Sequence, residues 1–185
     1  MMSSLVNPVP QDFSTTLYNQ IQPGLFMGGT ADDDVCFGTA GAKRPEDILP
    51  FDAIVTMYSW AKPAYWEIQE MRYGIYDSNM EDVDFDRLGE VVKFAHRHWK
   101  NGDRVLVRCQ AGLNRSGLVT ALTLMYEGAT AKEAIMCIRR NRSADALFNQ
   151  NYVRWLTAEG SAFISYLKSQ PGYYTVTMTE EADSI

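Results

Sequence analysis

The chain is most constrained by the stretch from Val105 to Gly117, in which an apolar run leads directly into a cysteine. The run Val105-Leu106-Val107 favours a β-strand, and the residues after Gly117 favour a helix. Cys109 stands at the entrance of the loop between them, and Arg115 stands at its exit. Such a loop directs backbone N–H groups inward at the positive end of the helix. The stretch therefore predicts a cradle for a tetrahedral oxyanion, with a thiol at its base.

Length and charge restrict the domain organisation and the partners of the chain. Its 185 residues suffice for one domain with a full hydrophobic core. We assign residues 1–185 to this domain, with an N-terminal arm at 1–16 and a C-terminal tail at 171–185. The net charge of -6 gives no bulk attraction to nucleic acid or to an anionic membrane. We therefore expect neither as a partner.

Cysteine content and the N-terminal sequence indicate a cytoplasmic protein. The three cysteines include no CxxC pair, which argues against a disulfide framework or a zinc site and favours a reducing compartment. Residues 1–20 lack the basic segment and long apolar core of a secretion signal. No apolar run approaches the length of a membrane span.

Two groups of residues could suggest a metal site, and both have simpler interpretations. Asp32-Asp33-Asp34 lacks the oxygen-ligand spacing of a calcium loop, so we interpret it as a surface turn or a helix cap. His96 and His98 are two residues apart on a predicted helix, so they point in different directions and are expected at the surface. We therefore expect no metal and no cofactor.

Strands and helices alternate along the predicted chain. We expect strands within residues 25–27, 51–59, 72–76 and 104–107, and helices over 62–71, 85–100, 117–126, 131–140 and 149–167. Asp84 is the expected N-cap of the second helix, Asn101-Gly102 its end, and Gly160 a point where the last helix can kink or split. The alternation implies a central, mostly parallel sheet of four to five strands with helices on both faces, an α/β fold.

The segment from Gln110 to Gly117, directly after Cys109, resembles the active-site loop of the cysteine-dependent dual-specificity and protein tyrosine phosphatases. The resemblance extends from about Pro23 to Leu156. Gly24 to Gly28 is similar to the strand that opens those catalytic domains, and Asn149 to Leu156 is similar to a later segment that contains an asparagine. The resemblance implies a phosphatase-like catalytic domain that hydrolyses phosphomonoesters, needs no metal, and is inhibited by phosphate-like oxyanions.

The residue types in the loop suit phosphoryl transfer through a covalent intermediate. Cys109 is the candidate nucleophile, because loop N–H groups, the helix start and Arg115 all favour its thiolate form. Arg115 offers planar donors to two phosphate oxygens at once, and Ser116 can give its hydroxyl proton to the sulfur when it leaves. Gly112 permits the tight turn. The expected phosphate-binding residues are Gln110, Ala111, Gly112, Leu113, Asn114 and Arg115.

The family also uses an aspartic acid on a separate loop as general acid and then general base. Asp77 follows a predicted short strand and precedes the helix that begins near Asp84, and this order matches the family's acid loop. A carboxylic acid there would protonate the leaving oxygen and later activate water. Asp82 and Asp84 are the rivals, but both stand where a helix cap is expected.

One residue departs from the family pattern. These enzymes usually carry histidine directly before the cysteine, and this chain carries Arg108. An arginine keeps a positive charge near the thiolate but cannot copy the contacts of an imidazole, so we expect a change in thiol reactivity or turnover. The departure motivates an alternative function, a catalytically weakened phosphatase-like module that binds phosphoproteins. A redox protein is disfavoured, because no partner cysteine lies near Cys109 in sequence.

The sequence favours phosphorylated protein or a small phosphate ester as substrate, with phosphotyrosine first and phosphoserine or phosphothreonine as further candidates. The loop has no lysine between Cys109 and Arg115, which disfavours inositol phospholipids. Another phosphatase substrate, a non-protein phosphate ester, stays open.

Several residues have two interpretations. The cations Arg139, Arg140 and Arg142 suit a second phosphate or a helix C-terminus, and Tyr58, Trp60, Tyr65 and Trp66 suit a cleft for a phosphotyrosine ring or the core.

Overall fold

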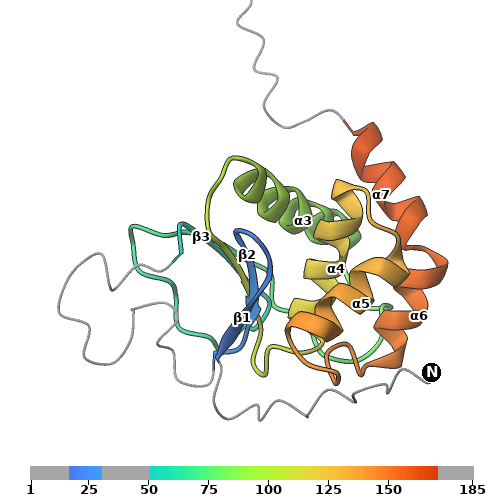
Figure 1. The fold of residues 1–185 in the computed structure, drawn as a ribbon, viewed down its shortest axis with the longest axis horizontal. Helices are drawn as coiled ribbons and strands as arrows, with labels where there is room; N and C mark the ends of the chain where they lie inside the picture. Colours follow the sequence, from blue (N-terminus) through green and yellow to red (C-terminus); the bar gives the residue numbers. More distant parts are fainter. Residues whose placement is uncertain (1–16, 31–50, 171–185) are drawn as a thin grey trace, which may run out of the picture.

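The computed structural model describes residues 17–30 and 51–170, and its centre is a five-stranded sheet (Figure 1). The strands are β1 (Tyr18–Gln22), β2 (Leu25–Gly28), β3 (Ala53–Thr56), β4 (Gln69–Arg72) and β5 (Val105–Arg108). They lie in the order β1-β2-β5-β3-β4, with β1 antiparallel to β2 and all other neighbours parallel. The predicted α/β class, with a mostly parallel sheet flanked by helices, is confirmed. The described helices lie on one face of the sheet and not on both as expected (Figure 1), because the other face is covered by residues outside helices, such as Phe51, Tyr65 and Ile68.

The parallel strands bring four chain segments to one edge of the sheet. The central strands β3 and β5 are wholly buried, as their apolar sequences require of parallel strands covered on both faces. In their register Thr56 lies beside Arg108, and on the flanking strands Gly28 and Arg72 occupy the same level. Loops that follow the carboxyl ends of parallel strands form the usual ligand site of such sheets.

The helices of the described residues gather on one side of the sheet (Figure 1). They are α3 (Phe85–Lys100), α4 (Arg115–Glu127), α5 (Ala131–Asn141), α6 (Gln150–Ala158) and α7 (Gly160–Ser169). Helix α4 is buried from Arg115 to Met125 and is contacted by the four other helices. This position explains its nearly continuous apolar sequence, because no side of it faces water.

The two faces of the sheet carry different clusters of buried residues. The larger core joins the helices to the strand residues that include Met27, Val55 and Val107. On the opposite face, Phe26, Phe51 and Leu106 belong to a smaller cluster. Because successive strand residues point to opposite faces, β5 directs Arg108 to the side of Leu106 and Cys109 to the side of the helices. Cys109 accordingly belongs to the larger core.

The predicted helix over residues 62–71 is wrong. Residues 62–65 are irregular, a turn follows, and β4 begins at Gln69. The predicted strand at 72–76 therefore starts three residues too late. Among the described residues, β4 is an edge strand that pairs only with β3, so its polar sequence Gln-Glu-Met-Arg lacks the apolar alternation that marks a half-buried strand.

The split expected near Gly160 is confirmed, whereas the expected surface position of His98 is wrong. The last predicted helix is split at Glu159 into α6 and α7, and a Cβ at Gly160 would lie only 2.9 Å from Met125 Cε. His98, expected at the surface, is 5% exposed, and its Nδ1 lies 2.6 Å from an oxygen of the Asp103 carboxylate. His98 stands one helical turn after the buried Phe94, so it shares the inward face of α3.

Some sequence features lie outside the described residues, namely the arm at 1–16, Asp32-Asp33-Asp34, Cys36 and the tail at 171–185. Within residues 17–30 and 51–170, no helix is long and apolar enough to cross a membrane. The same residues contain no group of three or more histidine, cysteine or acidic side chains that could hold a metal ion.

The N-cap of α3 gives a test of stability that is separate from the site. A carboxylate oxygen of Asp84 accepts hydrogen bonds from the N–H groups of Asp86 and Arg87 at 3.0 and 3.1 Å. We expect Asp84→Ala to lower the free energy of unfolding by about 1 kcal/mol, because these donors lose their partner. Asp84→Asn should preserve stability, because asparagine caps equally well. Urea unfolding measures both, and equal losses in the two variants would contradict a capping role.

Candidate active site

Cys109 lies at the carboxyl end of β5, directly below the start of α4. Its side chain is 2% exposed, and its Sγ lies 3.3 Å from the hydroxyl oxygen of Ser116. The N–H of Cys109 donates to the carbonyl of Gly28 at 3.2 Å, so the cysteine is fixed to the end of β2. The structure therefore brings together the thiol and the hydroxyl that the sequence predicts to act on it.

Three carbonyls of the loop after Cys109 are held by groups outside it. The pairs are Gln110 O with Thr30 N–H (3.1 Å), Gly112 O with Arg142 Nε (3.0 Å) and Leu113 O with Leu147 N–H (3.2 Å). In a trans peptide, a carbonyl and the following N–H point in opposite directions. The N–H groups of Ala111, Leu113 and Asn114 therefore point away from these outer partners and toward the inside of the loop, as an oxyanion cradle requires.

Close backbone contact between the loop and the end of β2 requires glycine. Gly112 has a φ of +70°, and a Cβ there would lie 2.3 Å from the carbonyl carbon of Gly28. A Cβ at Gly29 would lie 2.8 Å from the carbonyl oxygen of Gln110. No other residue fits at position 112, because both the conformation and the space exclude a side chain.

Arg115, the first residue of α4, is held beside the loop by two contacts. Its Nη1 donates to the carbonyl of Ile75 at 3.3 Å, and its guanidinium carbon lies 5.3 Å from the centroid of the Tyr58 ring. The side chain is 9% exposed, yet its buried Nε has no hydrogen-bond partner among the described residues. A buried donor without a partner is rare in native proteins, and an oxyanion in the loop would supply the missing acceptor.

Asp77 is tied to the loop by Asn114 and to the start of α6 by Asn149. Its carboxylate accepts hydrogen bonds from Asn114 Nδ2 at 3.0 Å and from Asn149 Nδ2 at 2.8 Å. Asn114 belongs to the loop, and Asn149 is the N-cap of α6. The carboxylate of Asp84, in contrast, is used at the N-cap of α3. Of these two candidate acids, the structure therefore brings Asp77 to the loop.

Tyr152, on α6, is not among the site residues that the sequence predicts. It is fully buried, and its hydroxyl donates to the carbonyl of Tyr76 at 2.8 Å. Burial raises the pKa of Tyr152 above its ordinary value, and the charge of Asp77 raises it further. The hydroxyl therefore stays protonated and fixes the backbone next to Asp77. A buried tyrosine hydroxyl needs a hydrogen-bond acceptor, and this need is the signal by which the sequence could have indicated a structural role for Tyr152.

The basic residues at the end of α5 support loops. Arg142 is buried and donates to the loop carbonyl of Gly112, as described above, and its Nη1 donates to Asn19 Oδ1 at 2.5 Å. Burial lowers the pKa of Arg142 from its ordinary value, and the electrostatic interaction with the nearby Cys109 opposes that shift. Arg139 donates to the carbonyls of Ala146 and Leu147, both at 3.1 Å. These contacts explain two of the three arginines without a second phosphate.

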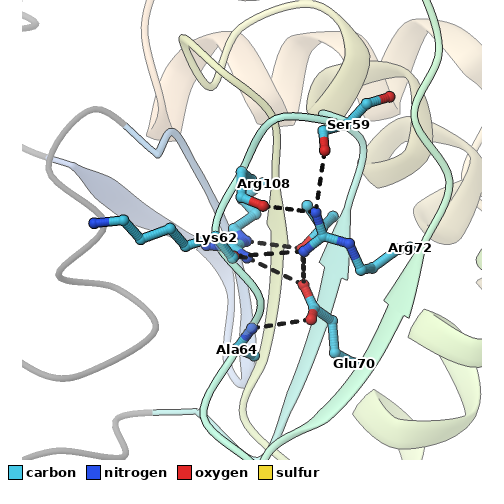
Figure 2. A network of polar contacts seen from close by, with 8 residues as sticks. Ser59, Lys62, Ala64, Glu70, Arg72 and Arg108 are labelled. Atoms are coloured by element: carbon cyan, nitrogen blue, oxygen red, sulfur yellow. Dashed lines mark hydrogen bonds and ion pairs between the residues drawn. The ribbon is translucent and has the colours of Figure 1, made fainter.

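The position of Arg108 corrects the expectation that its charge lies near the thiolate. Its side chain is fully buried on the face of the sheet opposite Cys109, and Figure 2 shows its polar contacts there. There Nε donates to the hydroxyl of Thr56 at 2.8 Å, and Nη2 donates to the carbonyl of Lys62 at 2.7 Å and to the Glu70 carboxylate at 3.1 Å. The alternation of β5 causes this separation.

The sequence left open whether the aromatic residues after β3 line a cleft or lie in the core, and the structure places them differently from one another. Trp60 and Trp66 are largely exposed, whereas Tyr58 and Tyr65 are half-buried. Tyr65 packs against the smaller cluster, and Tyr58 lies against Arg115. Cys137 is half-buried, and its sulfur contacts Gln22 Nε2 at 3.3 Å.

Comparison with known proteins agrees with this geometry. Residues 38–161 match the family of the dual specificity phosphatase catalytic domain. Over 124 residues, the chain is 28% identical to the "Putative tyrosine phosphatase 123R" of Invertebrate iridescent virus 6, covering 61% of this chain and 82% of the viral protein. The chain belongs to the dual specificity phosphatase family, a class of cysteine-dependent phosphatases.

Solved structures of low sequence identity share the fold. Human DUSP28 superposes with a TM-score of 0.62 at 19% identity, covering 89% of this chain and 100% of that protein. A mouse protein of the same phosphatase class, complexed with zinc tungstate, superposes with a TM-score of 0.57 at 19% identity, covering 88% of this chain and 96% of that protein.

The glycine contact provides a test of the cradle. We expect Gly112→Ala to weaken tungstate binding by about tenfold or more, because turning even one N–H away loses a charged hydrogen bond worth roughly 1.5–3 kcal/mol. Gly102→Ala is the matched control, since Gly102, just after α3, also has a positive φ of +94° but a Cβ there would meet nothing within 4 Å. Titration calorimetry measures both affinities. Unchanged tungstate affinity in folded Gly112→Ala would contradict the cradle.

Proposed function

We propose that the chain hydrolyses phosphomonoesters of proteins, phosphotyrosine above all, through a cysteinyl-phosphate at Cys109. Phosphoserine and phosphothreonine are further candidate substrates. The observation that supports the proposal most is the buried Nε of Arg115, which lacks an acceptor among the described residues and lies beside a loop whose N–H groups turn inward. Donors arranged in advance around a developing negative charge are a major source of catalysis in phosphoryl transfer.

In the proposed first step, the Cys109 thiolate attacks phosphorus, a P–S bond forms and the P–O bond to the substrate breaks. Asp77, as the carboxylic acid, gives its proton to the leaving oxygen. Arg115 and the loop N–H groups bind the equatorial oxygens throughout. In the second step, water attacks phosphorus and gives a proton to the Asp77 carboxylate, while the P–S bond breaks. The Ser116 hydroxyl, 3.3 Å from Sγ, stabilises the departing thiolate.

The surroundings of Arg115 favour an aromatic phosphate ester. The Tyr58 ring lies against the guanidinium, and Trp60, two residues later, is 85% exposed. Exposed aromatic side chains near a site can pack against a substrate ring at little entropic cost. Arg108 gives no support to a binding-only module, because its side chain lies on the other face of the sheet.

Substitution of the nucleophile tests the enzyme and the mechanism together. We expect the protein to hydrolyse p-nitrophenyl phosphate in reductant plus chelator, and Cys109→Ser to reduce the rate to background. Cys137→Ser is the matched control and should keep the wild-type rate, since its sulfur lies against Gln22 on β1. Trapping of a ³²P-labelled intermediate in wild type but not in Cys109→Ser would support the covalent step. Residual activity in Cys109→Ser would sink the nucleophile assignment.

Substitution of Asp77 tests the general acid. We expect Asp77→Ala to lower kcat by roughly a hundredfold to ten-thousandfold with little change in KM, because proton transfer is lost while the anion cradle remains. The pH–rate profile should change in the same variant. Asp82→Ala is the control and should behave as wild type. An unchanged profile in Asp77→Ala, with a changed one in Asp82→Ala, would move the role to Asp82.

A panel of phosphopeptides tests the substrate class. Peptides of one sequence that carry phosphotyrosine, phosphoserine or phosphothreonine differ only in the phosphorylated residue. We expect the largest kcat/KM for phosphotyrosine, because only its ring can pack against the aromatic residues near Arg115. Equal values for the three peptides would contradict a preference for phosphotyrosine while leaving the phosphatase activity intact.

A further inference from the structure

Arg108 is the largest of the fully buried side chains, and the proposed reaction makes no use of it. Removing a charge from water is costly unless ion pairs and hydrogen bonds compensate. Here the compensation comes from Glu70, which also accepts hydrogen bonds from Thr56 and from Arg72 Nη1 at 2.5 and 2.8 Å. Figure 2 shows Glu70 between the two guanidinium groups.

Hydrogen bonds hold Glu70 in its charged form. Burial alone would raise the pKa of Glu70, but hydrogen bonds from Thr56 and from the N–H of Ala64, with the charges of Arg72 and Arg108, lower it below its ordinary value. Glu70 is therefore a carboxylate at neutral pH, and the two arginines and this carboxylate form one ionic network.

The network fixes the backbone of residues 59–64, the segment that follows β3. Four of its backbone groups are bound: Ser59 O and Ala61 O by Arg72 Nη2 (3.5 and 2.7 Å), Lys62 O by Arg108 Nη2 (2.7 Å), and Ala64 N–H by Glu70 Oε2 (2.9 Å). The segment has no helix or strand of its own. Its conformation therefore depends on these side chains, which Figure 2 shows converging on it.

The fixed segment reaches Arg115 by two routes. Tyr58, directly before it, places its ring against the guanidinium of Arg115. Ser59 packs against Gly74 so closely that a Cβ on Gly74 would lie 1.9 Å from the Ser59 hydroxyl oxygen. Gly74 precedes Ile75, whose carbonyl accepts a hydrogen bond from Arg115 Nη1. The two residues that contact the Arg115 guanidinium therefore lie next to the network. Tyr58 precedes Ser59, which the network holds, and Ile75 follows Gly74, which packs against Ser59.

We infer that Arg108 is a positioning residue for Arg115. With Glu70 and Arg72, it fixes residues 59–64, and through Tyr58 and Ile75 these residues set the guanidinium of Arg115 in the plane that two phosphate oxygens require. The role rests on the proposed function of Arg115 as the phosphate-binding arginine. Bidentate binding depends on orientation, so a small displacement of the guanidinium weakens both anion binding and turnover.

The first experiment substitutes Arg108 by methionine, which keeps the long apolar stem and removes the donors. We expect tungstate affinity to fall by about tenfold and kcat/KM for p-nitrophenyl phosphate by roughly tenfold to a hundredfold, in protein that circular dichroism shows to be folded. Arg104→Met is the matched control, since Arg104 lies at the opposite end of β5 over Phe26 and Phe51. Wild-type affinity and turnover in folded Arg108→Met would overturn the inference.

A double-mutant cycle separates positioning from general destabilisation. Tyr58→Leu removes the ring that contacts Arg115. If Arg108 acts partly through this ring, the loss in kcat/KM for Arg108→Met with Tyr58→Leu is smaller than the product of the two single losses. Losses that multiply fully would show that Arg108 does not act through Tyr58 and would overturn that route.

Glu70→Gln keeps the test decisive if Arg108→Met does not fold, because it preserves the side-chain shape and removes the charge. We expect the same direction of change in tungstate affinity and kcat/KM, with smaller size. Tungstate titration needs no turnover. Failure of wild type to hydrolyse any phosphate ester would therefore refute the proposed function alone, whereas active variants with wild-type tungstate affinity would refute the positioning role alone.

Discussion

The backbone contact between the end of β2 and the loop at Gly112 is the constraint on which the site depends. A side chain at this point would collide with the carbonyl carbon of Gly28, so only glycine lets the loop curl against the sheet. Once the loop is seated there, Thr30, Arg142 and Leu147 hold its carbonyls on the outside. The inward direction of the N–H groups follows from the planarity of the peptide bond. The loop is suited to bind an anion because its carbonyl groups have their hydrogen-bond partners on the outside, which leaves its N–H groups pointing inward.

The alternation of β5 gives the two neighbours Arg108 and Cys109 separate environments. Cys109 lies with the helices, under the start of α4, whereas Arg108 lies on the opposite face among Thr56, Glu70 and the segment that follows β3. A change of residue type at position 108 therefore does not place a new charge beside the thiol. It changes the side chain that holds residues 59–64, the segment that follows β3. Tyr58, directly before this segment, contacts Arg115.

The sequence predicted those parts that depend on local chemistry. The strand, loop and helix around Cys109 and the Asp84 cap follow from spacing and residue type within short segments, whereas Asp77 follows from the resemblance to the phosphatase family. Strand β4 could not be predicted in the same way, because its Glu70 pairs with Arg108 on β5 and its Arg72 binds the irregular segment that follows β3. The same holds for Arg142, for which the sequence left open a second phosphate or a helix C-terminus, whereas the tertiary structure buries its side chain against Gly112.

The acid and the anion cradle are connected through one side chain, Asn114. Its Oδ1 accepts a hydrogen bond from the N–H of Asn149 at 3.0 Å, and its Nδ2 donates to Asp77. Amide groups do not titrate, so Asn114 and Asn149 keep their N–H donors whatever the protonation state of Asp77. The Tyr152 hydroxyl fixes the backbone next to Asp77 by donating a hydrogen bond to the carbonyl of Tyr76. The carboxyl group that we propose as general acid and base is thereby held against the candidate phosphate-binding loop by partners that do not titrate.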